Sequence, residues 1–299
     1  MGFRAGANDY LAKPAFWSKI ISQVESLLSE SAVTQSSNIV FVSSGDNLGL
    51  TTILANLATT IAECEKQVIL IDIVAGQTSG DSRDKPDVPY TGSIILETDP
   101  ADSGHAEPNY ELLPSGIRIL HIDEDTGHDD ERSAKQFEIV QKMGLVNDYL
   151  LINLPFKVSG LNKSILCHSS LCIIVSDFRI TRLAEIYSMA TSLRFLGVTP
   201  ERMAAILVDT EGKHSSTSLL SGKPYIEANL GITLAGVVSL DVEMYRLSYL
   251  DSQSIVNASP NSQLVRDINI IAQFILTRKH TAQDSLKTVH EKPGLEKKL

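Results

Sequence analysis

The chain has 299 residues, a mass of 32.6 kDa and a formal net charge of −10. Its hydrophobic content of 43% excludes global disorder, and its three cysteines exclude a disulfide scaffold. The apolar runs are too short for a transmembrane helix, and the acidic charge disfavours nucleic acid as a partner. We therefore expect a soluble, cytoplasmic protein that does not insert directly into a membrane.

Residues 1–30 form a first segment. In its second half, FWSKIISQVESLL, apolar side chains recur at the spacing of a helix. The periodic positions are Ile20, Ile21, Val24, Leu27 and Leu28. Tyr10, Phe16 and Trp17 form an apolar cluster in the same segment, and an exposed cluster of this kind marks an interface or a liability. Residues 31–37 are polar and aperiodic, which predicts a linker.

From residue 38 to residue 278, apolar strands alternate with helical patterns. NIVFVS, a helix over 51–63 and QVILIDI make a βαβ unit, which implies parallel strands. Further strands are expected at 116–122, 149–153, 171–176, 203–209 and 234–239, and helices at 134–143, 182–196 and 264–276. The predicted fold class is α/β, a mostly parallel sheet with helices on both faces.

Two segments lack periodicity. Residues 75–109 are rich in Gly, Ser, Asp and Pro, and we interpret them as a long loop or an irregular insertion. Residues 279–299 are polar and charged, which predicts a disordered tail.

The end of the first strand, the turn and the start of the following helix read FVSSGDNLGLTTILANLA. A phosphate-binding P-loop needs a glycine-rich turn followed by Lys and then Ser or Thr at a helix start. Gly49, Thr51 and Thr52 keep that register, but Leu50 stands at the lysine position. Because leucine cannot neutralise a phosphate, the motif alone predicts only a weakened site.

The stretch from this strand through ANLA to QVILIDI resembles the opening of MinD/ParA-type ATPases. NDYLLINLP is similar to the switch-II strand of that family, and AAILVDT to the strand that ends at its adenine-contacting residue. The resemblance covers 38–278 and implies a P-loop NTPase-like fold, a homodimer, and ATP with Mg²⁺ as cofactors, Thr51 being the metal-binding position. The implied nucleotide-site positions are Gly45, Asp46, Asn47, Leu48, Gly49, Leu50, Thr51, Thr52, Asp72, Asn153 and Asp209.

The chain departs from the family at the positions that carry chemistry. The family's lysines fall at Gly45 and Leu50, loop glycines at Asp46 and Asn47, and three polar residues at Val74, Asn153 and Asp209. These changes remove charge neutralisation, metal coordination and water activation. We therefore expect no catalytic residue and no hydrolysis.

The N-terminal GANDYLAKP resembles the end of a response-regulator receiver domain, with Lys13 at the position of the receiver lysine. We therefore interpret 1–30 as the C-terminal remnant of such a domain. A receiver joined to a MinD/ParA-like domain is the layout of CpaE/TadZ-type pilus-localisation proteins. That layout implies protein partners in a pilus, secretion or signalling complex, and recruitment to the membrane or a cell pole through them.

Four functional hypotheses remain open. The first is a non-hydrolysing localisation or scaffold factor. The second is an ATP-binding protein or slow ATPase that dimerises on Mg-ATP. The third is a ParA-like DNA binder, which the acidic charge disfavours. The fourth is a decayed gene product without a function.

Two further clusters have simple interpretations. The acidic run from His121 to Glu131 has no regular ligand spacing, so we expect a solvated loop rather than a metal site. Cys167 and His168 are expected to end a helix, and Cys172 to lie in a buried strand, rather than to form a thiol site.

Overall fold

The computed structural model describes residues 36–45, 48–75, 110–113, 115–124, 130–156, 159–178, 180–209, 223–239 and 254–290. The strands are β1 (Ser37–Ser43), β2 (Val68–Ala75), β3 (Glu111–Leu112), β4 (Arg118–Glu124), β5 (Tyr149–Asn153), β6 (Leu171–Asp177), β7 (Met203–Asp209) and β8 (Thr233–Ser239). The helices are α2 (Leu50–Ala62), α3 (Asp130–Val146), α4 (Gly160–Cys167), α5 (Ile180–Phe195), the 3-10 turn η2 (Pro200–Arg202), α7 (Lys223–Leu230), α9 (Ile255–Ala258) and α10 (Gln263–His290).

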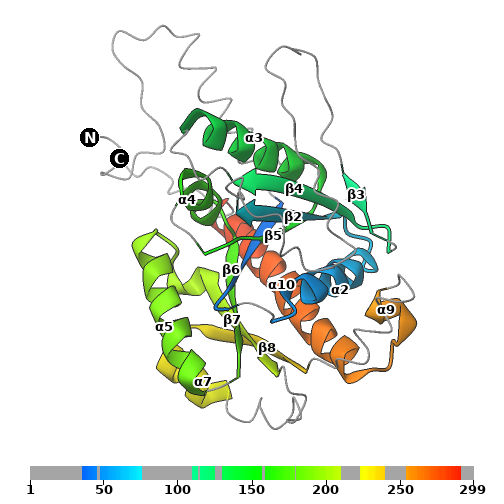
Figure 1. The fold of residues 1–299 in the computed structure, drawn as a ribbon, viewed down its shortest axis with the longest axis vertical. Coiled ribbons are helices and arrows are strands. Elements are labelled where there is room, and N and C mark those ends of the chain that lie inside the picture. The colour runs from blue at the N-terminus through cyan, green and yellow to red at the C-terminus, as the bar shows by residue number, and fades with distance from the viewer. Residues whose placement is uncertain are drawn as a thin grey trace, which may run out of the picture.

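The strands form one eight-stranded sheet in the order β3-β4-β2-β5-β1-β6-β7-β8 (Figure 1). All ladders are parallel except the short antiparallel pairing of β3 with β4. Every residue of β6 and β7 is buried, which explains why both sequences are apolar up to their last one or two residues, since a parallel sheet is covered on both faces.

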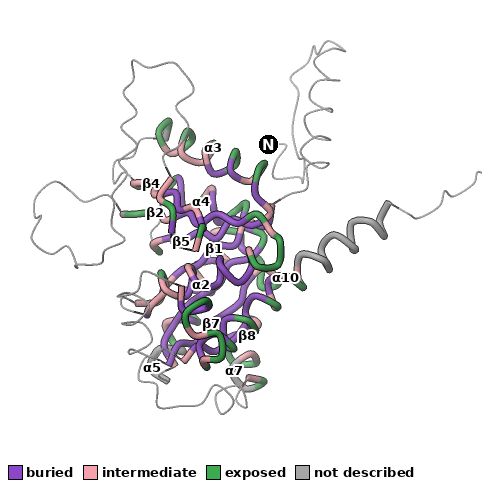
Figure 2. Tube along the Cα trace, turned by 90° about the vertical axis from the view of Figure 1, so that its right-hand side faces the viewer, coloured by how far each residue is buried: buried purple, intermediate pink, exposed green. Residues whose placement is uncertain are grey.

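Two apolar clusters cover the two faces of the sheet. On one face, α3, α4 and α5 pack on alternate strand residues such as Val40 and Ile152. On the other face, α2, α9 and α10 pack on the intervening residues, such as Phe41 and Leu151. Figure 2 shows the sheet buried at the centre and the exposed surface on the outer sides of the helices. The predicted α/β class with helices on both faces is confirmed.

Several element boundaries differ from the prediction. β1 begins at Ser37, inside the expected linker, and β4 runs to Glu124 instead of ending at residue 122. The short helices α7 and α9 and the edge strand β3 were not predicted. The helix α10 continues to His290, past the expected end at residue 276 and into the segment expected to be a disordered tail. Residues 1–35 and 76–109 lie outside the described residues, as do Asp46 and Asn47.

The interpretation of His121–Glu131 as a solvated loop was wrong for its first part. His121 to Glu124 belong to β4, and their strand continues the alternation of Ile119, whose side chain is buried. The cysteine interpretation holds: α4 ends at Cys167 with His168 as its C-cap, and Cys172 is buried in β6. Burial raises the pKa of Cys172 to about 12, so this thiol stays protonated.

Candidate functional site

The turn between β1 and α2 keeps the backbone of a phosphate-binding loop in part. Gly49 precedes the helix with φ 65°, the left-handed conformation that glycine adopts without strain. The N-cap residue of α2 is this glycine, which has no side chain to accept from the first N–H groups of the helix. The first N–H groups of α2 therefore need partners other than the N-cap residue, and helix starts of this kind are where anions bind.

Two leucines anchor this turn to the core. Leu48 is buried, and the Leu50 side chain packs against the apolar cluster between α2 and the sheet. At the position where a P-loop lysine would reach toward phosphate, this chain thus has a side chain that contributes to folding. Thr51 is exposed in the first turn of α2, and Thr52 is half-buried.

Serines fix the loop to its neighbouring strand. The Ser44 hydroxyl donates to the Ser176 hydroxyl of β6 at 2.7 Å, and Ser44 N donates to the Val175 carbonyl at 2.9 Å. The Ser43 hydroxyl donates to the Gly45 carbonyl. These bonds hold the described part of the loop at the carboxyl end of β1 without any cationic side chain.

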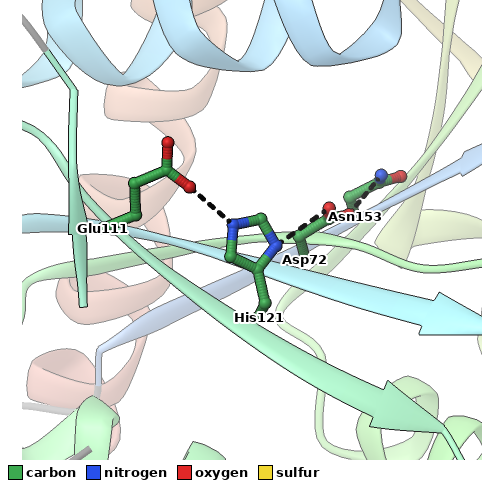
Figure 3. A network of polar contacts seen from close by, with 4 residues as sticks. All are labelled: Asp72, Glu111, His121 and Asn153. Carbon is green, nitrogen blue, oxygen red and sulfur yellow. Dashed lines mark hydrogen bonds and ion pairs between the residues drawn. The ribbon is translucent and has the colours of Figure 1, made fainter. Parts of the chain in front are cut away.

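Beside the loop, four polar side chains from four neighbouring strands form a continuous chain of contacts, which we call the polar row (Figure 3). Asn153 Nδ2 donates to Asp72 Oδ1 at 2.7 Å. The other Asp72 oxygen lies 3.3 Å from His121 Nδ1, and His121 Nε2 lies 3.2 Å from Glu111 Oε2. The sequence analysis identified Asp72 and Asn153 as site positions, and the structure brings them into direct contact.

His121 is the centre of the row. Its side chain is 13% exposed and lies between two carboxylates. The hydrogen bond to Asp72 raises the pKa of His121 above its usual 6.5; burial opposes this, and Glu111 adds to the increase. When both ring nitrogens are protonated, each N–H faces one carboxylate, so the imidazolium links β2, β4 and β3.

The arrangement of the row does not suit a metal ion. The two carboxylates lie against opposite ring nitrogens of His121, so the three groups do not converge on one point. Within the described ranges, no set of three or more His, Cys, Asp or Glu side chains is placed to hold a metal. Asn153 offers an amide where a carboxylate would bind Mg²⁺, and its NH₂ group is bound to Asp72.

Asp209 does not join the row. It is buried at the carboxyl end of β7, and β5, β1 and β6 separate that strand from Asp72 on β2. Glu111 and His121 were not predicted as site residues. A signal for His121 was present: it follows Ile119 by two residues, which places both side chains on the same face of a strand.

The comparisons with known proteins identify the fold. No family model matches the sequence, and the search of curated proteins gives no match. Among solved structures, a ParA family ATPase from Chlorobium tepidum TLS is 18% identical, with a TM-score of 0.54 over 80% of this chain and 99% of that chain. The MinC:MinD complex of Aquifex aeolicus is 16% identical, with a TM-score of 0.59 over 88% of this chain and 99% of that chain.

The fold is that of the MinD and ParA ATPases. A third structure with this fold, the septum site-determining protein MinD of Pyrococcus horikoshii OT3, was solved in complex with Mg-ADP. It is 18% identical, with a TM-score of 0.54 over 86% of this chain and 100% of that chain. The MinD/ParA fold therefore accommodates Mg-nucleotide, and the residues of this chain decide whether its own loop does so.

The raised pKa of His121 predicts a pH-dependent contribution to stability. A pKa that is higher in the folded state stabilises the protein below the unfolded value of about 6.5, and this contribution is lost as pH rises through the folded pKa. Replacing His121 by Gln should therefore lower the free energy of unfolding by about 1 kcal/mol at pH 5.5 and by less at pH 9. Urea denaturation at both pH values measures the difference.

The exposed His168, changed to Gln, provides the control, because it lies at the end of α4 and outside the row; its loss at pH 5.5 should be smaller than that of the His121 variant. An equal loss at both pH values for the His121 variant would mean that its charge plays no part in the row.

Proposed function

We propose that the chain is a degenerate MinD/ParA-like protein that acts as a non-hydrolysing localisation or scaffold factor. The observation that carries the proposal is Leu50, whose side chain packs against the core at the position where a P-loop has its phosphate-neutralising lysine. Phosphoryl transfer depends on positive charge and a bound metal around the transferring group. Residues 44–52 contain no cationic side chain.

The polar row supports the same conclusion. Metal-assisted hydrolysis uses a free carboxylate near the loop to hold Mg²⁺ or its water. Here Asp72 is engaged by Asn153 on one oxygen and lies against His121 with the other. Asp72 and Asn153, two positions of the implied nucleotide site, therefore form structural contacts between strands.

We expect purified protein to hydrolyse Mg-ATP no faster than the buffer blank and to release no binding heat in calorimetry. The physical reason for both expectations is that residue 50 is a leucine and has no positive charge to neutralise the phosphates. The measurements are phosphate release and isothermal titration at low salt. Hydrolysis or binding heat that disappears in Thr51→Ala would contradict the proposal, because the site would then be functional.

A second candidate function is Mg-ATP-dependent dimerisation without cleavage. The observation that favours it is the retained Gly49 turn, in which the N-cap residue of α2 is a glycine that offers no capping side chain. Backbone N–H groups bind phosphate oxygens without a lysine. Sedimentation of the protein with and without Mg-ATP distinguishes the two candidates, since only this one requires a nucleotide-dependent change in mass.

The cellular role that we propose rests on the resemblance of the chain to CpaE/TadZ-type proteins. The receiver-like N-terminus followed by a MinD/ParA-like domain supports a role in placing a pilus or secretion assembly, through a homodimer and protein partners. The similarity to a MinD found in complex with MinC supports a protein partner. Among the described helices, none has the length and apolar character needed to cross a bilayer.

A further inference from the structure

The edge strand β3 is attached to the sheet by fewer backbone pairs than any other described strand. It pairs with β4 at two positions, Glu111 with Ile119 and Leu112 with Arg118, whereas β2 pairs with β4 at seven. Among the described strands, none lies beyond β3 on this side of the sheet (Figure 1). Two pairs alone make a marginal ladder, so side-chain contacts decide whether β3 stays paired.

One of these side-chain contacts depends on a proton. The His121 ring lies between Glu111 on β3 and Asp72 on β2, with its Nε2 3.2 Å from Glu111 Oε2 and its Nδ1 3.3 Å from Asp72 Oδ2 (Figure 3). An imidazolium donates from both nitrogens, whereas a neutral imidazole has one N–H and presents a lone pair at the other nitrogen. When His121 loses its proton, one of the two carboxylates must therefore face a lone pair.

The strand pairing decides which carboxylate loses its donor. Asp72 cannot move away from the ring, because β2 is paired with β4 at seven positions on one side and with β5 at five on the other. Asn153 Nδ2 also holds the second Asp72 oxygen at 2.7 Å. Glu111 belongs to a strand with two pairs, so it can separate at the lower cost. The remaining N–H therefore stays on Nδ1, toward Asp72, and the repulsion acts on Glu111.

Acidic groups alone surround His121 among the described residues. Asp72 and Glu111 lie on the adjacent strands, and Asp123 follows two residues later on the same face of β4. The helices α2 and α9, which cover this face, contain no charged residue. On α10, the described charged side chains bond to residue 201, to β8 or within the helix: Arg266, Asp267 and Arg278. No described cation is therefore placed to replace the imidazolium.

We propose that the protonation state of His121 controls the pairing of β3 with β4, so that loss of the proton releases Glu111 and opens the two pairs. The pKa of His121 is raised above 6.5, chiefly by the hydrogen bond to Asp72. The pairs are therefore closed below pH 6.5 and open as pH rises through the raised pKa. The open state exposes N–H and C=O groups at the edge of β4, the kind of edge to which a further strand can add.

The opening is local, because both ends of β3 have contacts that do not depend on His121. Before it, the Tyr110 hydroxyl donates to Met143 Sδ at 3.1 Å. After it, Leu113 is buried, and its N–H donates to the Ile117 carbonyl at 2.8 Å. The change is therefore confined to residues 111 and 112.

A nitroxide spin label at residue 112 reports on this pairing, because the Leu112 side chain is 67% exposed. The full chain with Leu112→Cys, Cys64→Ser and Cys167→Ser has one accessible thiol, since Cys172 is buried. We expect electron paramagnetic resonance to show a mobile fraction that rises about threefold between pH 5.5 and pH 9. The midpoint should lie above pH 6.5, as the raised pKa of His121 requires.

Glu111→Gln is the matched variant, because its amide can accept from the imidazolium and can donate to the neutral ring. In that background the label should keep the mobility of the paired strand at both pH values. His121→Gln removes the titrating group, so the mobility should not change with pH. A label on Val146→Cys, at a side chain of similar exposure, 63%, on α3, should not respond to pH.

A constant mobile fraction in the labelled parent protein would overturn the proposal. A pH response that persists in Glu111→Gln or in His121→Gln would do the same, because the contact between residues 111 and 121 would not be its cause. An equal response at residue 146 would show that the whole fold changes with pH rather than β3. Circular dichroism at both pH values establishes that each variant is folded.

Discussion

Replacing Asn153 by Asp should destabilise the folded protein by about 2 kcal/mol at pH 7.5. The substitution removes the hydrogen bond from Asn153 Nδ2 to Asp72 Oδ1 and places a second carboxylate at the same 2.7 Å distance. Like charges this close cannot both ionise without cost, so part of the loss should be recovered at pH 5, where the pair can share a proton. Urea denaturation at the two pH values provides the test.

Asn153→Ala is the matched control, because it removes the hydrogen bond and adds no charge. We expect it to cost about 1 kcal/mol, with the pH dependence of the parent protein. If the Asp and Ala variants have the same free energy of unfolding at pH 7.5, no like-charge repulsion acts between residues 153 and 72. The description of the row as a structural device would then be wrong.

Replacing Asp267 by Ala should cost about 3 kcal/mol. Asp267 is 1% exposed on α10 and accepts hydrogen bonds from Ser239 N at 3.0 Å and from Gln263 Nε2 at 2.7 Å. The substitution leaves the N–H of Ser239 without its acceptor at a place where the Ser239 hydroxyl is buried and has no hydrogen-bond partner among the described residues. Chemical denaturation measures the loss.

Asp267→Asn separates the acceptor from the charge. Its carbonyl oxygen can still accept from Ser239 N, so we expect roughly half the loss seen for Ala. If the Ala variant stayed within 0.5 kcal/mol of the parent protein, about the effect of a surface substitution, Asp267 would not connect α10 to β8.

The body of the fold was predictable because local signals agree with the tertiary structure. The apolar runs that contain Phe41 and Ile71, with the helical pattern after Leu50 between them, predicted a βαβ unit, and the alternation that follows implied a parallel sheet. The edge strand β3 was not predictable, since two residues carry no periodicity. The same holds for α9, whose start depends on a distant residue: Asn56 Oδ1, buried in α2, accepts from Val256 N at 3.1 Å.

The candidate site was predictable only where the chain follows the order of a known family. Asp72 and Asn153 were identified as positions, but their mutual hydrogen bond was not, because the register of β2 against β5 decides it. Glu111 reaches His121 only because β3 turns back against β4, with residue 111 paired to Ile119. Contacts between side chains on different strands depend on which strands pair and in which register, and the sequence does not show this even where it predicts each strand clearly.

The polar row also bears on how such a protein changes over generations. Asn153 takes part in contacts that join four strands, so a change to aspartate in any descendant produces a less stable protein. Leu50 adds a second barrier, since a lysine there would withdraw apolar contacts from the core. Asn153→Asp and Leu50→Lys would therefore each reduce stability, and any nucleotide chemistry that they introduced would come with that cost.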